Sequence, residues 1–326
     1  MYYSSLLSIF GNLDQLNSVQ INFDQSSVNL MNAAIAFIMF GVALGIKPQH
    51  FKDIISNPKP AIIGVISQYL LLPALTFLLV FIIQPNVAVA LGMILVASCP
   101  GGNVSNMISA LSKSNVALSV SLTASTTVLS LFMTPLNFAF WGSLYANRSP
   151  LLVPITIEPI EMFRTVFIIL GIPVILGMLV GTKFPVFAKK VEKYVQIASI
   201  VFFIAFLVAS LAGNFSLFLE YIHLIFFIVL IHNGIAFLGG YFFPRSLKID
   251  KINSRTIAIE TGIQNSGLGL ALIFNPRIFP PDLELGGMAF VAAWWGIWHI
   301  VAGLILAFYW RRKPIKTENP ETVVAS

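Results

Sequence analysis

The sequence has few charged residues and almost no cysteine. Of its 326 residues, only 10% are charged and 57% are hydrophobic. Soluble proteins usually carry about 25% charged residues, so this composition excludes a soluble globular domain. The single cysteine, Cys99, excludes an internal disulfide and leaves the redox compartment open. Apolar runs of about 20 residues recur along the chain, and they indicate an integral membrane protein built of helices.

Motifs of common enzymes and nucleic-acid-binding proteins are also missing. The chain has no nucleotide-binding loop, no zinc-ligand spacing and no serine nucleophile with a matching base, so we expect no enzyme. The net charge of +6 does not indicate nucleic acid, because the basic residues stand at the ends of apolar runs. The start, MYYSSLLSIFGNL, lacks the basic region and long apolar core of a cleavable signal peptide. The lipid bilayer is the expected partner, and no obligate protein partner is indicated.

Nine apolar runs qualify as membrane spans. Their expected ranges are 29–46, 61–83, 88–112, 116–141, 162–182, 195–218, 221–243, 255–276 and 286–309. Residues 1–28 are too polar to span and form an expected extracytoplasmic segment, whereas 311–326 form an expected solvated tail. The sequence therefore predicts an all-α integral membrane protein with nine transmembrane helices.

The basic residues fall mostly on one side of these spans. Counted along the alternating connections, 16 of the 19 lysines and arginines share a side, and only Arg148, Arg164 and Arg277 lie on the other. Positively charged loops remain in the cytoplasm. We therefore expect a multi-pass protein of the cell's inner (plasma) membrane, with the amino terminus outside and the carboxyl tail in the cytoplasm.

One carboxylate stands at membrane depth. Of 13 acidic residues, only Glu260 lies well inside an apolar run, in the stretch ETGIQNSGLG. Its burial costs about 2.5–3.5 kcal/mol even on a lenient insertion scale. Protonation of the carboxylate or a bound cation would offset this cost. The neighbours favour a hard cation, because Gln264, Asn265 and Ser266 add side-chain oxygens and the glycines let the helix unwind and expose carbonyl oxygens. Close helix packing on small residues would explain the glycines alone.

A second polar break interrupts the third run. In CPGGNVSN (99–106), Pro100 removes a helix hydrogen bond, two glycines permit a turn, and Asn103, Ser105 and Asn106 follow. Each break belongs to the middle span of a three-span group, and the two middle spans run in opposite directions. Broken helices at matching places of two inverted halves are typical of secondary transporters with a site near the midplane.

These segments also carry a family resemblance. CPGGNVSN, KSNVALSVSLT, IHNGIAFLGG, IETGIQNSGLGLAL and WHIVAGLILA closely resemble the bile acid:sodium symporter family, from about residue 29 to 310. The resemblance implies an inverted-repeat transporter domain over 29–310, with a core (61–141 and 221–309) and a panel (29–46 and 162–218). It further implies two broken helices that cross near the midplane, with two sodium ions behind the crossing.

Matched position by position, the resemblance assigns two sodium sites. The first comprises Ser105, Asn106, Ser119, Thr123 and Glu260; the second comprises Gln68, Glu260, Gln264 and the backbone carbonyls of Thr261 and Ile263. Ser119 and Thr123 share one helix face by their spacing, although helix hydroxyls often bond to their own backbone. Gln68 is expected on a regular helix, where an isolated amide needs a partner.

The resemblance also implies three candidate substrate contacts: Asn103, Asn265 and His299. For His299, a packing role beside the neighbouring tryptophans is an equal alternative. The amino termini of the half-helices favour an anion. The resemblance thus implies sodium-coupled symport of an organic anion by alternating access. The anion would be bile acid-like or a small carboxylate such as pantoate.

Other transport classes fit the sequence less well. A sodium/proton exchanger of related fold would be expected to carry more acids on its crossing helices, and a metalloid exchanger would need a reactive thiol, for which only Cys99 is available. A channel should offer a continuous polar pore, whereas the polar residues here cluster at one depth. Cys99 is expected to pack in the core, and His232 and Asn233 to hydrogen-bond within it.

The nine-span topology can be tested by chemical labelling. Five spans separate residues 1–28 from residues 183–193, so the two segments should lie on opposite sides of the membrane. A cysteine introduced into 1–28 should react with an impermeant thiol reagent from outside, and one introduced into 183–193 should not. Labelling of both from the same side would mean an even number of crossings between them.

Overall fold

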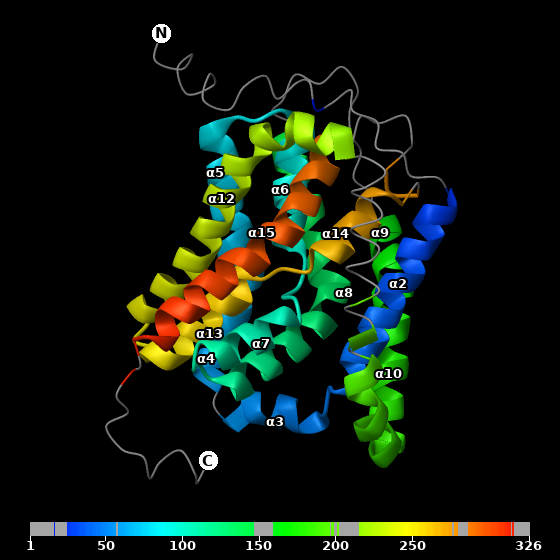
Figure 1. Ribbon diagram of the computed structural model, residues 1–326, viewed down its shortest axis with the longest axis vertical. Coiled ribbons are helices and arrows are strands. Elements are labelled where there is room, and N and C mark those ends of the chain that lie inside the picture. The colour runs from blue at the N-terminus through cyan, green and yellow to red at the C-terminus, as the bar shows by residue number, and fades with distance from the viewer. Residues whose placement is uncertain are drawn as a thin grey trace.

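The computed structural model describes residues 16, 25–56, 58–146, 159–195, 197–198, 201, 215–275, 277–279, 286–313 and 315. Within these residues the chain is almost entirely helical, without any strand and with one isolated β-bridge (Figure 1). The all-α class predicted from the sequence is confirmed. Most of the predicted span 195–218, and most of the 1–28 and 311–326 segments, lie outside the described residues.

Five helices of the described chain are long and apolar enough to cross a membrane, and each coincides closely with a predicted run. They are Pro58–Ile83 (α4 Pro58–Ile66, η2 Ser67–Leu71, α5 Leu72–Ile83), α8 Val116–Ala146, Pro159–Lys183 (α9 Pro159–Val166, η3 Phe167–Gly171, α10 Ile172–Lys183), the Ile225–Ser246 part of α12 (Phe215–Ser246), and α15 Gly286–Arg311. Helix α2, Gln25–Leu44, covers the first predicted run. The count of nine spans stays a prediction.

Two further runs are each split into a pair of short helices, as predicted. The third run forms α6 (Val87–Ser98) and α7 (Val104–Leu111), and the eighth forms α13 (Lys251–Gly262) and α14 (Ser266–Ile273). Figure 1 shows both connecting segments at the centre of the molecule, with α6 and α14 above them and α7 and α13 below. The chain is therefore irregular at one depth, in the middle of the bundle.

Two of the long helices contain a π-helical turn, η2 and η3, that the sequence analysis did not predict. Each turn is followed by a proline at the start of the next helical segment, Pro73 after η2 and Pro173 after η3. Proline has no N–H, so it removes one helix hydrogen bond. In the wider π-helical turn the hydrogen bonds span five residues instead of four, and Leu72 N donates to Ser67 O. The regular helix expected around Gln68 is wrong, because Gln68 lies within η2.

Helices α2 and α10 form a close pair along one side of the molecule (Figure 1). Glycine permits the contact: a Cβ built on Gly177 would lie 2.6 Å from Phe40 O, and one on Gly181 would lie 2.7 Å from Leu44 O. Any larger residue would push the two backbones apart. Helix α2 contacts α14, and the part of the long helix before α10 (α9 and η3) contacts α8.

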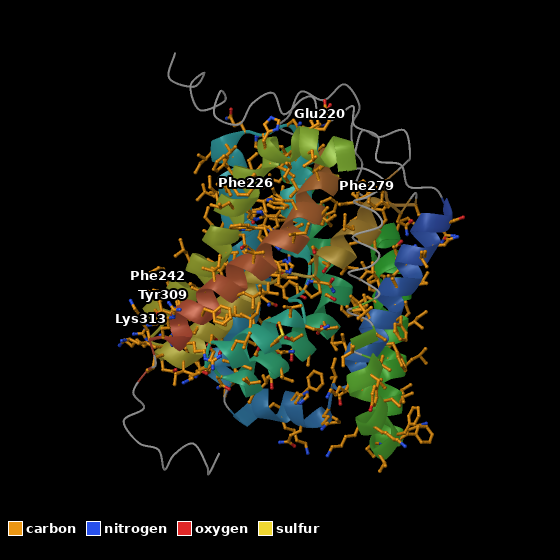
Figure 2. The ribbon with its side chains drawn as sticks, in the orientation of Figure 1. Glu220, Phe226, Phe242, Phe279, Tyr309 and Lys313 are labelled. Atoms are coloured by element: carbon orange, nitrogen blue, oxygen red, sulfur yellow. The ribbon has the colours of Figure 1, made fainter. Side chains whose placement is uncertain are left out.

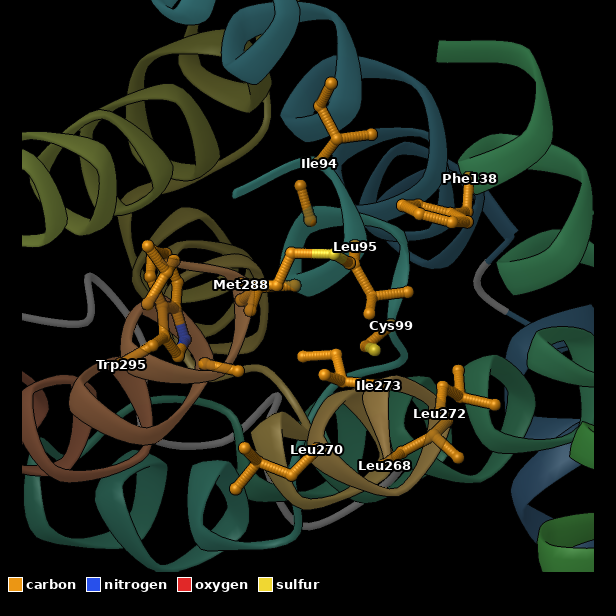
Figure 3. Packing of buried hydrophobic residues seen from close by; sticks show 14 of the residues in the cluster. Ile94, Leu95, Cys99, Phe138, Leu268, Leu270, Leu272, Ile273, Met288 and Trp295 are labelled. Atoms are coloured by element: carbon orange, nitrogen blue, oxygen red, sulfur yellow. The ribbon is translucent and has the colours of Figure 1, made fainter. Parts of the chain in front are cut away.

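The main apolar core lies beside the crossing segments. Figure 3 shows side chains from α6, α14 and α15 converging there, among them Leu95, Leu268 and Met288. Cys99 is buried in the same cluster with its thiol free. The expected packing role of Cys99 therefore agrees with its position, and its thiol does not face solvent.

Charged residues gather at the ends of the helices. Figure 2 places Glu220 at one end of the bundle and Lys313 at the other. Near Lys313, the buried Arg255 of α13 donates from Nη2 to Lys313 O at 2.9 Å and stacks over the Trp310 ring at 5.4 Å. A cation at the carboxyl end of α15 complements the helix dipole. Helix α3 (Pro48–Ser56) lies across this same end and connects α2 to α4 (Figure 1).

Candidate cation and substrate site

The two helix breaks pair with each other through their backbones. Gly102 N donates to Ile263 O at 2.8 Å, and Asn265 N donates to Pro100 O at 2.8 Å. Together they form an antiparallel bridge between Gly101 and Gln264. Irregular backbone at membrane depth must have its polar groups satisfied within the protein. Here each break supplies donors and acceptors to the other, so neither is stable in this form without its partner.

Glu260 lies at the end of α13 and is fully buried. Its carboxylate accepts hydrogen bonds from Ser105 Oγ at 2.6 Å, from Ser119 Oγ at 2.5 Å and from Thr123 Oγ1 at 3.1 Å. No lysine, arginine or histidine within the described ranges forms an ion pair with it. The carboxylate is therefore surrounded by hydroxyl groups and has no countercharge from these residues.

Asn106 completes the first predicted group of ligands. Its Oδ1 lies 2.9 Å from Ser119 Oγ and 3.3 Å from Thr123 Oγ1. A hydroxyl has one proton and can donate to one acceptor at a time. Ser119 and Thr123 therefore cannot satisfy both Glu260 and Asn106 fully. The result is a compact set of oxygens with more lone pairs than protons, which is the donor set that a hard cation prefers. All five residues predicted for the first sodium site meet here.

The second predicted group lies around the backbone at the end of α13. Gln68 Nε2 donates to Glu260 O at 2.7 Å, and Gln264 Nε2 donates to Thr261 O at 2.8 Å. Both glutamines are buried, and the Oε1 atom of each has no hydrogen-bond partner. An unpartnered buried amide oxygen is costly, and a cation between the two would remove that cost. The Ile263 carbonyl already accepts from Gly102 N but has a second lone pair.

The substrate candidates Asn103 and Asn265 each precede a half-helix. Asn103 is partly exposed at the start of α7, and its side chain makes no capping bond. Asn265 caps α14, because its Oδ1 accepts from Leu268 N at 3.1 Å, and its Nδ2 lies 3.8 Å from Met39 Sδ on α2. The backbone bridge brings both half-helix amino termini together, where their partial positive charges favour an anion.

His299 lies on the face of α15 that packs against the crossing. A Cβ on Gly296 would lie 2.7 Å from Ser266 Oγ, and one on Gly303 would lie 2.9 Å from Ile263 Cδ1. Gly296, His299 and Gly303 are three and four residues apart and so share a helix face. His299 is buried and its Nδ1 has no partner. The substrate-contact role and the packing role of His299 both stay predictions.

Two neighbouring residues of α12 form the core hydrogen bonds expected of them. His232 Nε2 and Thr76 Oγ1 lie 2.7 Å apart, and Asn233 Nδ2 donates to Gly262 O at 2.8 Å. The contact of Asn233 with Gly262 could not be predicted from sequence, because the rest of α12, a loop and α13 separate the two residues along the chain. The sequence analysis assigned Gly101 only to a turn, although it also lies close to the side chains of Gln68 and Glu260.

Comparison with known proteins agrees with this geometry. A family model described as the Sodium Bile acid symporter family matches residues 33–221. The chain belongs to this family. Relatives include an uncharacterized sodium-dependent transporter, YocS, of Bacillus subtilis, which is 34% identical over 87% of this chain and 84% of its own length. Members of the sodium bile acid symporter family are sodium-dependent transporters, and this chain is a multi-pass membrane protein of that kind.

More distant relatives of the symporter family come from plants and mammals. The probable chloroplastic sodium/metabolite cotransporter BASS2 of rice is 31% identical over 82% of this chain and 64% of its own length. The ileal sodium/bile acid cotransporter of rabbit is 27% identical over 82% of this chain and 78% of its own length. The names of these relatives state different substrates, a metabolite and a bile acid, so family membership does not identify the organic substrate.

Replacing Gly101 by alanine tests how closely the break must approach the site. The added Cβ would lie 2.6 Å from Gln68 Nε2 and 3.0 Å from Glu260 Oε2, so both side chains would have to move. We expect about 1–3 kcal/mol of destabilisation, as for other overpacked sites. We also expect a smaller rise in melting temperature on adding sodium.

Gly269→Ala is the matched control. Its Cβ would meet only Cys99 Sγ, at an ordinary 3.7 Å, and alanine is a better helix former than glycine. This variant should keep the full sodium response and should not lose stability. Equal sodium responses in the two variants would show that the close approach at Gly101 does not matter to cation binding.

Proposed function

We propose that the protein is a sodium-coupled symporter of an organic anion that binds two sodium ions and works by alternating access. The observation that carries the proposal is the fully buried Glu260 carboxylate, surrounded by hydroxyl and amide oxygens at the point where two broken helices meet. A bound cation would neutralise that charge, and the family's dependence on sodium supports sodium as that cation.

The first sodium ion is assigned to Ser105, Asn106, Ser119, Thr123 and Glu260. The short distances among their oxygens support this assignment, because these atoms would otherwise share too few protons. The second ion is assigned to Gln68, Glu260, Gln264 and the carbonyls of Thr261 and Ile263. The two unpartnered glutamine oxygens support it. The shared carboxylate makes binding of one ion dependent on the other.

The organic anion is assigned to the side of the crossing where α7 and α14 begin, with Asn103, Asn265 and His299 as contacts. The converging amino termini of two half-helices supply partial positive charge without a lysine or arginine. Asn265 also contacts Met39 of α2, which belongs to the proposed panel. A substrate at this position would therefore touch both moving parts. We propose a bile acid-like anion or a small carboxylate such as pantoate.

The moving parts are a core of residues 61–141 and 221–309 and a panel of residues 29–46 and 162–218. The close α2–α10 pair supports the panel as a unit, and the paired breaks support the core as another. Sodium binding would neutralise Glu260 and stabilise the crossing, and the anion would then dock against the half-helix termini. A shift of the core against the panel would then expose the bound sodium ions and the anion to the cytoplasm. The proposed orientation in the inner (plasma) membrane has the amino terminus outside and the carboxyl tail inside.

Glu260→Gln tests the carboxylate directly. An uncharged amide is cheaper to bury than a carboxylate, so the variant should fold. It should lose the sodium-induced rise in melting temperature, because the charge that attracts both ions is gone. The measurement is thermal unfolding of the purified protein in sodium or in potassium at equal ionic strength.

Glu161→Gln is the control for this experiment. Glu161 is partly exposed and pairs with the exposed Arg164 one helical turn away, so its loss should not change the sodium response. A full sodium-induced rise in Glu260→Gln would exclude Glu260 as the ligand of either ion.

The stoichiometry is tested by uptake into proteoliposomes, with pantoate and a bile acid as probes and the potential set by potassium and valinomycin. Two sodium ions with a monovalent anion carry one net positive charge inward. Uptake should therefore accelerate at negative interior potential, which supplies about 2.3 kcal/mol per charge at 100 mV. The Hill coefficient for sodium should exceed one.

Gln68→Ala should lower both the Hill coefficient and the response to potential, because it removes a ligand of the second ion only. Asn106→Ala should weaken the first ion together with the start of α7. Uptake of a monovalent anion that ignores the potential, with a Hill coefficient of one in the wild type, would rule out two-sodium symport.

A further inference from the structure

The carboxyl end of α13 leaves four backbone carbonyls without a helical partner. They belong to residues 260–263, because a helix cannot supply amide donors for its last four C=O groups. Three of them are satisfied within the site already described: Glu260 O by Gln68, Thr261 O by Gln264, and Ile263 O by the backbone of Gly102. The fourth, Gly262 O, accepts from Asn233 Nδ2 at 2.8 Å.

Asn233 therefore replaces a backbone donor that the break has removed. In a continuous helix, the N–H of Ser266 would donate to Gly262 O, four residues earlier. Here Ser266 N instead donates to Gln264 O at 3.0 Å. Without Asn233, the Gly262 carbonyl would be buried with no partner. If the break became helical, Ser266 N could donate to Gly262 O, so loss of Asn233 should favour that change.

Helix α12 is built to bring Asn233 to this point. Asn233, Phe237 and Gly240 are spaced by four and three residues and share one face. A Cβ on Gly240 would lie 2.9 Å from Ala258 Cα, and one on Gly262 would lie 2.4 Å from the Phe237 ring. The two helices are therefore in close contact along this face, and Asn233 lies just beyond the end of α13.

The other half of the Asn233 amide has no partner. Asn233 is fully buried and its Oδ1 makes no hydrogen bond, as is also true of Oε1 in Gln68 and Gln264. The three amides thus share one arrangement, with the nitrogen on a carbonyl at the end of α13 and the oxygen free. An apolar residue would be cheaper to bury than a half-satisfied amide. The bond to Gly262 O offsets part of this cost, but the unpartnered Oδ1 of Asn233 still adds to it.

We propose that Asn233 is a positioning residue for the second cation. It holds the break in α13 open, so that the Thr261 and Ile263 carbonyls and the Gln264 amide keep the arrangement that the ion requires. The proposal rests on the proposed function, because it concerns one of the two sodium sites assigned there. It adds α12 to the elements on which cation binding depends, and the side chain acts through Gly262 rather than on the ion itself.

The test compares Asn233→Leu with Thr76→Val in the purified full-length protein. Leucine has a similar size but cannot donate to Gly262 O. Loss of a residue that orients metal ligands typically lowers affinity 10–100-fold. We expect the sodium concentration that gives half of the thermal shift to rise about tenfold, with a lower Hill coefficient for sodium in uptake.

Thr76→Val is the matched control, because it removes the hydrogen bond from Thr76 to His232, the residue next to Asn233 on the same helix. Both bonds are fully buried, but this one joins α12 to α5 and does not involve α13. Thr76→Val should lower the melting temperature and leave the sodium midpoint unchanged. If Asn233→Leu does not fold, Asn233→Ser is measured instead, since a hydroxyl is too short to reach Gly262 O.

The outcomes separate this proposal from the one on which it rests. A wild type that sodium does not stabilise would overturn the proposed function and this inference together. A wild type with a normal response, and an Asn233 variant with an unchanged sodium midpoint, would overturn only the role of Asn233. Equal shifts of the midpoint in Thr76→Val and the Asn233 variant would also overturn it, because a general loss of α12 packing would then explain both.

Discussion

The burial of one carboxylate constrains most of what surrounds it. Glu260 is removed from water, and neither lysine nor arginine compensates its charge within the described residues. Hydroxyl donors from α7 and α8 reduce the cost, but they are shared with Asn106 and cannot eliminate it. Burial of this kind is tolerated where it serves a function. The hydroxyls, the glycine at position 101 and the breaks in two helices are the local adjustments that accompany it.

The broken helices are costly on their own and become stable as a pair. Each break exposes backbone donors and acceptors in a region that excludes water. The bonds from Gly102 to Ile263 and from Asn265 to Pro100 cancel part of that cost, and Gln68, Gln264 and Asn233 cancel the rest at the end of α13. These donors come from η2, α12, the segment before α7 and the segment between α13 and α14. The geometry of the site therefore depends on the relative positions of elements far apart in the sequence.

The sequence predicts the local features of this arrangement and misses the nonlocal ones. Pro100 and the glycines reveal the breaks because their effect on the backbone is local, and the depth of Glu260 is evident from the apolar residues on both sides. The positions of Ser119 and Gln68 beside Glu260 came from a family resemblance, since no periodicity places separate helices together. The π-turn at Gln68 was missed, although Pro73 was its visible signal. The meeting of the two breaks was likewise expected only from the resemblance, and the contact of Asn233 with Gly262 was not predicted.

A site assembled in this way links ion binding to the arrangement of the helices. Both glutamines proposed to hold the second ion donate a hydrogen bond to a carbonyl at the end of α13, and Asn233 of α12 donates to another. We therefore expect an ion that binds there to favour one relative position of α12, α13 and η2. A ligand shifts a conformational equilibrium only by its difference in affinity between the states. Glu260 belongs to both proposed sodium sites, so its neutralisation would contribute to the difference in sodium affinity between the two conformations. Glu260 lies close to the half-helix amino termini that are proposed to bind the organic anion. The proposed coupling of sodium to substrate then requires no long pathway through the protein, since the paired breaks carry residues of both the proposed cation sites and the proposed substrate site.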